Sequence, residues 1–204
     1  VVKLSGNSLI YLTYQSFPAE TANSQQTISN IKYLVKRGMD VSLYFPLREK
    51  NSTDDITKIQ KFYGIEETFK VFGLSHRLPF GKIKFFNSIS FYVSHFIWSW
   101  YVVNKYFKNR NIDNIFFTRS EWISFFLSRK ECKIIFECHQ TSKTRNFIIN
   151  RLKVKENVQF IFLNDTLEKF YSVKEKQSNV FHNGVDAELF QNINSKIKKQ
   201  IIFI

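Results

Sequence analysis

The sequence lacks the glycine-rich motifs with which many α/β proteins hold nucleotides. Only 6 of its 204 residues are glycine and only 3 are proline. The loop after the first apolar run reads "QSFPAETANSQQ" and contains no GxGxxG, and neither a Walker P-loop nor a GxSxG sequence occurs in the chain. These absences argue against a nucleotide bound in the usual dinucleotide manner.

Cysteine is scarcer still. The two cysteines, Cys132 and Cys138, flank the apolar run "KIIF", and a strand of that length would hold them roughly 20 Å apart, too far for a disulfide. Neither belongs to a CxxC pair, and no histidine–cysteine cluster has the spacing of a metal site. We therefore expect reduced thiols, a cytoplasmic location and no metal cofactor.

The chain also lacks an apolar run long enough to cross a membrane. Its most apolar passage, residues 89–103, is shorter than the roughly 20 residues that a spanning helix needs. The passage also contains three serines and a histidine. We expect a buried amphipathic helix there rather than a membrane span.

Acidic residues are absent from residues 68–112, where seven lysines and arginines are interleaved with aromatic residues. The whole chain carries a formal net charge of +13, which permits an anionic partner without requiring one. The stretch resembles a face that meets anionic lipid headgroups, although a solvated basic face would look the same. The membrane-facing candidates are Lys82, Lys84, Lys105 and Lys108.

What the sequence does contain is a regular alternation of short apolar runs with segments of helical periodicity. A hydrophobic content of 44% with 23% charged residues is that of a globular domain. The alternation predicts a Rossmann-like, doubly wound α/β domain with a mainly parallel sheet of about seven strands. The predicted strands are residues 8–14, 40–45, 69–74, 114–118, 133–138, 158–163 and 179–182.

In such a sheet the ligand binds at the carboxyl ends of the strands, near the point where the strand order reverses. His139 directly follows the predicted strand 133–138. There it could donate a hydrogen bond to a sugar hydroxyl or exchange a proton, with a purely structural role equally open. The substrate-binding candidates at the other strand ends are Gln15, Asn23, Ser24, Arg119, Glu121 and Thr141.

Several of these candidates also have a structural interpretation. Asn23 and Ser24 lie at a predicted helix N-terminus, whose free N–H groups favour an anion. They could equally do no more than cap that helix, since Asn23 and Gln26 have the spacing of a capping pair. Arg119 suits a phosphate or a carboxylate, but a loop pair between Arg119 and Glu121 is the alternative.

Four segments resemble, in this order, the N-terminal domains of family 4 retaining glycosyltransferases, which have the GT-B fold of two facing Rossmann-like domains. The most specific segment is "HNGVDAELF", which looks like the family's Asn-Gly-Val-Asp linker between the domains. The resemblance covers nearly the whole chain. The four segments are residues 9–46, 117–122 ("FTRSEW"), 134–144 ("IIFECHQTSKT") and 179–190 ("NVFHNGVDAELF").

The resemblance implies a division of the chain and a reaction. Residues 1–182 would form the acceptor-side domain, residues 183–199 an interdomain linker, and residues 200–204 the first strand of a missing donor-binding domain. The whole enzyme would transfer a sugar from a nucleotide-sugar donor to a glycan or lipid-linked acceptor, with retention of configuration and without a metal. The present chain alone would be inactive, and the enzyme would lie on the inner face of the membrane.

The resemblance also assigns roles to single residues. His139 matches the family's cleft histidine, which contacts the transferred sugar. Asn23 and Ser24 match the loop that closes over the donor phosphates, although the glycine pair common in that loop is absent here.

Two rival functions remain open at this point. A nucleotide-sugar epimerase also uses two such domains, but the linker and the first loop favour the transferase. A basic α/β module that binds nucleic acid is the other rival, against which the chain shows no nucleic-acid motif and its aromatic residues have core periodicity. We therefore expect no nucleic-acid partner, and binding to heparin compared with anionic vesicles across salt would separate the two classes.

Overall fold

The computed structural model describes residues 8–77, 87–108 and 114–182. The predicted linker (183–199), the predicted strand at 200–204 and the candidates Lys82 and Lys84 lie outside the described residues.

Seven parallel strands form one sheet in the order β3-β2-β1-β4-β5-β6-β7. The predicted doubly wound, Rossmann-like α/β fold is therefore confirmed. The strands are β1 (Ser8–Leu12), β2 (Asp40–Leu47), β3 (Lys70–Ser75), β4 (Ile115–Thr118), β5 (Lys133–Cys138), β6 (Val158–Phe162) and β7 (Ser178–Val180).

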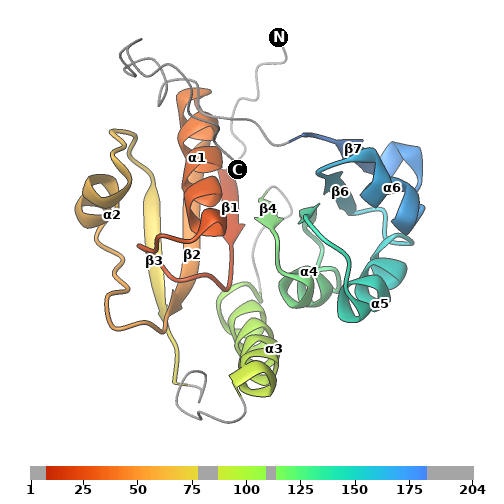
Figure 1. Cartoon of the computed structure of the whole chain (residues 1–204), viewed down its shortest axis with the longest axis horizontal. Coiled ribbons are helices and arrows are strands. Elements are labelled where there is room, and N and C mark those ends of the chain that lie inside the picture. The colour runs from red at the N-terminus through yellow and green to blue at the C-terminus, as the bar shows by residue number, and fades with distance from the viewer. Residues whose placement is uncertain (1–7, 78–86, 109–113, 183–204) are drawn as a thin grey trace, which may run out of the picture.

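Helices cover both faces of the sheet (Figure 1). The side chains of α1 and α2 share one apolar cluster with alternate residues of β1 and β2, whereas α3 to α6 belong to a second cluster on the opposite face. The helices are α1 (Ala22–Lys36), α2 (Ile56–Tyr63), α3 (Asn87–Tyr106), α4 (Glu121–Leu127), α5 (Lys143–Leu152), α6 (Asp165–Tyr171) and the short 3-10 helix η2 (Glu175–Gln177).

The central strand β1 shows why the apolar runs are continuous. Leu9 and Tyr11 pack in the cluster with α1, while Ile10 and Leu12 pack in the cluster with α3 to α6. A strand that is buried on both faces needs apolar side chains at every position, as is typical of parallel sheets. Successive strands run outward from β1 to β3, and the chain then returns to place β4 on the other side of β1. The strand order thus reverses between β1 and β4.

The N-terminal cap of α1 differs from the predicted one. Thr21 occupies the cap, and its side chain accepts a hydrogen bond from the backbone N–H of Ser24. The predicted capping pair of Asn23 and Gln26 is therefore wrong, because the helix begins at Ala22 and both residues already lie within it. A threonine at this position satisfies one of the free N–H groups of the first turn.

The side of α3 that packs on the sheet also differs from the side that the residue spacing predicts. The predicted helix is present, but only part of its apolar periodicity faces the core: Ile89, Val93 and Trp100 are 62%, 47% and 52% exposed, whereas Val103 is buried. Ser94 and Ser99 are buried in their place. Because large apolar residues occur all around this helix, their spacing could not select the face that packs on the sheet. Among the described residues, no helix is both long and apolar enough to cross a membrane.

Candidate functional site

Arg119, Glu137 and His139 meet at the carboxyl edge of the sheet, beside the point where the strand order reverses. Arg119 follows β4, and Glu137 lies near the end of the neighbouring strand β5. The Arg119 Nε donates to Glu137 Oε2 at 2.9 Å, and its Nη2 donates to Oε1 at 3.2 Å. His139 Nε2 lies 2.9 Å from the same Oε1. We call these three residues the edge cluster.

The Glu137 carboxylate is buried but remains ionised because of its neighbours. Burial pushes the pKa of Glu137 upward, yet the His139 ring and the Arg119 guanidinium outweigh burial and hold the pKa below its ordinary value. The side chains of Arg119 and Glu137 are 8% and 6% exposed, whereas that of His139 is 20% exposed. His139 is thus the member of the edge cluster that solvent or a ligand can reach most readily.

Arg119 also joins the edge cluster to the N-terminus of α1. Its Nη1 donates to the backbone oxygen of Asn23 at 3.4 Å, a contact that spans the reversal point from β4 to α1. Asn23 is exposed, whereas Ser24 is buried and its hydroxyl lies 2.8 Å from the Thr21 hydroxyl. The Gln15 side-chain oxygen accepts from Thr27 at 3.2 Å. Asn23 is therefore the candidate in this loop whose side chain is free of the protein interior.

Glu121 does not join the edge cluster. Its Oε2 accepts from Arg145 Nη2 at 3.2 Å, and Arg145 Nη1 donates to the Gln140 backbone oxygen at 3.0 Å. The alternative of a pair between Arg119 and Glu121 is therefore wrong, because Arg119 pairs with Glu137 on β5 and Glu121 pairs with Arg145 on α5. Thr141 is exposed in the loop before α5.

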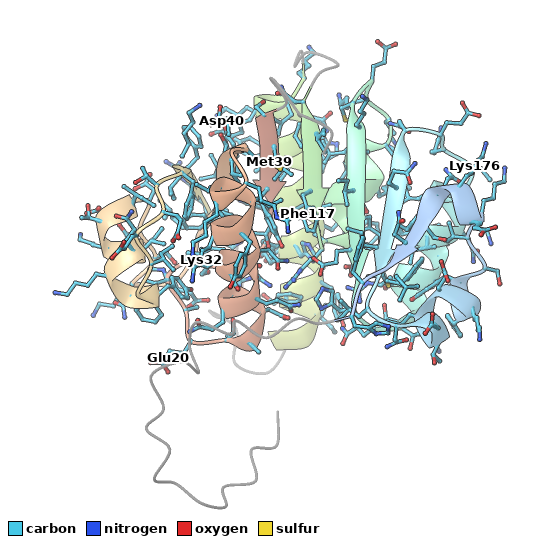
Figure 2. The ribbon with its side chains drawn as sticks, turned by 90° about the horizontal axis from the view of Figure 1, so that it is seen from above. Glu20, Lys32, Met39, Asp40, Phe117 and Lys176 are labelled. Carbon is cyan, nitrogen blue, oxygen red and sulfur yellow. The ribbon has the colours of Figure 1, made fainter. Side chains whose placement is uncertain are left out.

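A groove of about 460 Å³ runs between α1 and the strands β4 to β6. Glu137 contributes one wall, so the groove begins beside the edge cluster. Figure 2 shows Phe117, another lining residue, beside α1. The lining residues are Gln26, Asn30, Tyr33, Leu34, Arg37, Phe117, Glu137, Ile161, Leu163, Phe181 and His182. The lining of the groove combines apolar side chains with polar ones, among them the Glu137 carboxylate.

A second polar cluster occupies the same edge on the opposite face, below α3. His95 stacks on Tyr14 with ring centroids 4.5 Å apart, and its Nε2 lies 2.6 Å from the Ser120 hydroxyl. The Tyr14 hydroxyl lies 2.8 Å from His76 Nε2, and the Arg48 guanidinium lies 4.7 Å from the Tyr14 ring. The His95 contacts anchor α3 to the ends of β1 and β4, and Tyr14 links them to His76, which follows β3.

His95 should make the fold sensitive to mild acid. Burial, with a smaller contribution from Arg48 and Arg145 against that of Glu121, lowers its pKa to about 4, from an ordinary value of about 6.5. The unfolded chain therefore takes up this proton first, and stability is lost as the pH falls from about 6.5 towards 4. Between pH 6.5 and 5 the loss should be about 1.5 kcal/mol, because the slope reaches its full 1.36 kcal/mol per pH unit only once the unfolded histidine is fully protonated.

Urea unfolding at several pH values measures this effect. A His95→Gln variant should be less stable at pH 7 but should show a flatter pH dependence between 6.5 and 5. Glu137 does not interfere, because its lowered pKa gives a stability contribution that is complete above the ordinary glutamate pKa of about 4.3 and is lost only as the pH falls below that value. An unchanged slope in the variant would assign the acid sensitivity to other groups.

Sequence reasoning missed Glu137, which connects two of its candidates. The signal was an acidic residue within the apolar run "KIIFEC", two positions before His139. Residues two apart on a strand point to the same face, so the pair could have been anticipated. Arg145, the partner of Glu121, gave no comparable signal because it sits in an ordinary helical pattern.

No group of three or more potential metal ligands occurs within residues 8–77, 87–108 and 114–182. The two free cysteines, Cys132 and Cys138, are both buried. The described part of the site therefore presents a buried ion pair and a partly exposed histidine as its chemistry.

These features define a doubly wound α/β domain with a charged cluster at its reversal point. Neither a protein-family model nor a curated protein sequence matches the chain. Solved structures with the same fold include a glycosyltransferase from Rickettsia africae ESF-5, at a TM-score of 0.53 and 14% identity over 93% of this chain and 47% of that one. The N-terminal domain of trehalose-6-phosphate phosphatase from Candida albicans matches at a TM-score of 0.56 and 12% identity, over 93% and 51% of the two chains.

The present chain thus spans about half the length of these solved structures. At such low identity the likeness shows the fold, which is a Rossmann-like fold shared with a glycosyltransferase.

Proposed function

We propose that this chain is the acceptor-side half of a two-domain glycosyltransferase. The enzyme would transfer a sugar from a nucleotide-sugar donor to a glycan or lipid-linked acceptor, with retention of anomeric configuration. The edge cluster carries the proposal, because it places a partly exposed histidine and a buried ion pair where doubly wound domains bind their ligands. The shared fold with a glycosyltransferase supports the same class.

His139 is the residue proposed to touch the sugar. Its 20% exposed ring stands at the end of β5, where it can donate a hydrogen bond to a hydroxyl of the transferred sugar. Glu137 would act as a positioning residue, because its carboxylate lies against the ring and limits how the ring can turn. Arg119 already has a carboxylate partner in Glu137, so its proposed role is to fix that carboxylate.

The donor phosphates are proposed to lie between α1 and the second domain. The first turn of α1 presents backbone N–H groups that favour an anion, and Asn23 is exposed beside them. The leaving phosphate would itself take the proton from the acceptor hydroxyl, so this half of the enzyme contributes positioning and charge stabilisation. Transfer is proposed to need no metal. A cytoplasmic, peripheral position on the inner face of the membrane would suit a lipid-linked acceptor.

Transfer from a panel of nucleotide sugars tests this function. The full-length protein should turn over one donor in the presence of chelator and keep the configuration of the anomeric carbon in the product, read by NMR. The 204-residue chain should fold, by circular dichroism, yet transfer nothing, because the proposed donor site is in the second domain. An inverted product, or turnover by the 204-residue chain alone, would contradict the proposal.

A further inference from the structure

The outward face of α3 exposes more large apolar side chains than any other element of the described chain. Of the fifteen such side chains that are exposed in the described residues, eight lie on this one helix. They are Ile89, Tyr92, Val93, Phe96, Ile97, Trp100, Tyr101 and Tyr106. We call this set the α3 face.

The α3 face is only partly used in packing within the domain: the Phe96 ring lies 4.8 Å from Trp122 and 5.4 Å from Phe126 of α4, yet it remains 40% exposed. The helix contacts the sheet through its other side, where Ser94, Ser99 and Trp98 are buried. The inward side thus combines small hydroxyl residues with Trp98, Val102 and Val103, while the outward side is also rich in aromatic residues, unlike that of an ordinary surface helix. An exposed apolar surface of this kind marks a site of interaction with a partner or a membrane.

The charges around the α3 face indicate which kind of partner it binds. No acidic residue occurs on α3, and the only one on the neighbouring helix α4, Glu121, is buried against Arg145. Basic residues stand at the C-terminal end of the face: Lys105 donates to the Tyr101 hydroxyl at 2.6 Å, and Lys108 is exposed. The surface is therefore apolar and aromatic with a cationic border.

The same end of the face gains further positive charge from α4. Lys130, just after that helix, donates to the Asn104 side chain of α3 at 3.3 Å. Arg129 is exposed, with its guanidinium 4.5 Å from the Phe125 ring. The contact with Asn104 holds Lys130 beside α3, whereas Arg129 lies on an aromatic ring of α4.

We propose that the α3 face docks on an anionic membrane surface, with the helix lying in the plane of the interface. Tryptophan and tyrosine prefer the headgroup level, and lysine attracts anionic lipids there. A protein partner fits the border less well, because lysine is depleted at protein–protein interfaces. The inference rests on the peripheral location given above for the proposed function, but not on sugar transfer.

Docking through this face would bring the candidate site to the lipid surface. The first half of α3 lies at the carboxyl edge, since His95 contacts Ser120 just after β4, and Figure 1 shows the helix at that end of the sheet. The edge cluster belongs to the same edge. A lipid-linked acceptor could then reach the site without leaving the membrane.

Vesicle cosedimentation of the full-length protein tests the proposal. The variant Val93→Gln, Ile97→Gln, Trp100→Gln removes three exposed side chains that share one face of the helix. Binding to vesicles of equal parts phosphatidylcholine and phosphatidylglycerol should fall at least about tenfold. The matched control, Phe147→Gln, Val154→Gln, Phe170→Gln, removes three side chains that are 50%, 69% and 57% exposed elsewhere and should bind like the parent.

A second variant tests how much the positive charge contributes to vesicle binding. Changing Lys105 and Lys108 to Gln should weaken binding about fivefold for each lysine at low salt, and the difference should shrink as salt is added. Vesicles of phosphatidylcholine alone should bind all proteins more weakly.

Three outcomes would overturn the proposal. One is binding by the α3 triple variant that equals that of the parent and the control. Another is a parent protein that binds no vesicle. The last is a parent that self-associates through this face, seen by sedimentation as a dimer that the triple variant loses. A failed proposal would leave sugar transfer intact, because turnover with a water-soluble acceptor is measured separately.

Discussion

Replacing His139 with alanine in the full-length protein should lower kcat by about a hundredfold and leave the melting temperature almost unchanged. The size is that of a lost positioning or electrostatic contact in a transition state. Stability should change little, because the ring stands at the end of β5 with 20% exposure rather than inside the core. Steady-state kinetics and thermal unfolding on one preparation measure both quantities.

His182→Ala is the matched control for this variant. His182 is also a histidine at the carboxyl edge, exposed and lining the groove beside Glu137, but it makes no contact with the edge cluster that the structure records. Its replacement should leave kcat within a factor of about two of the parent. A His139→Ala protein that melts earlier but turns over normally would remove His139 from the site and make its role structural.

Replacing Glu137 with alanine should have the largest effect on stability. The change leaves Arg119 without its ion-pair partner. The Arg119 side chain is only 8% exposed, and its guanidinium makes two hydrogen bonds to the carboxylate that is lost. Removing one partner of a buried pair costs about 3–5 kcal/mol, because the other charge is left uncompensated. Urea unfolding at neutral pH measures this loss.

Two comparisons separate the buried pair from an ordinary ion pair. Asp40→Ala breaks the exposed pair between Asp40 and Lys70, which are 56% and 59% exposed, and should cost less than about 1 kcal/mol. A double variant, Arg119→Met with Glu137→Met, should recover most of the stability, because no charge is left buried. A Glu137→Ala protein no less stable than Asp40→Ala would show that the pair is solvated in solution.

The sheet could be predicted because every strand has to satisfy the same simple condition. Runs such as "SLIYL" and "KIIF" are apolar at successive positions, as burial on both faces requires, and the helices between them fix parallel pairing. Each of the seven predicted strands accordingly overlaps an observed one. The end of β5 could be placed with equal security, which put His139 at the carboxyl edge.

The buried face of α3 and the partner of Arg119 could not be predicted, because the spacing of residues along the sequence does not determine them. For α3, apolar residues on all sides left the buried face to be decided by packing against Tyr14 and Phe116, which are distant in sequence. Arg119 has two acidic residues within reach. It pairs with Glu137 rather than with Glu121, because β5, the strand of Glu137, lies beside β4 in the sheet. Both outcomes follow from tertiary contacts.

The most direct test of the central claim is whether a nucleotide sugar reaches the edge cluster. The full-length protein, labelled with ¹⁵N at its histidines, can be titrated with the donor that the transfer assay selects. The account predicts that the ring signals of His139 shift saturably with the donor, while those of His95, which is buried below α3, stay in place. Saturable donor binding that leaves the His139 signals unchanged would contradict it.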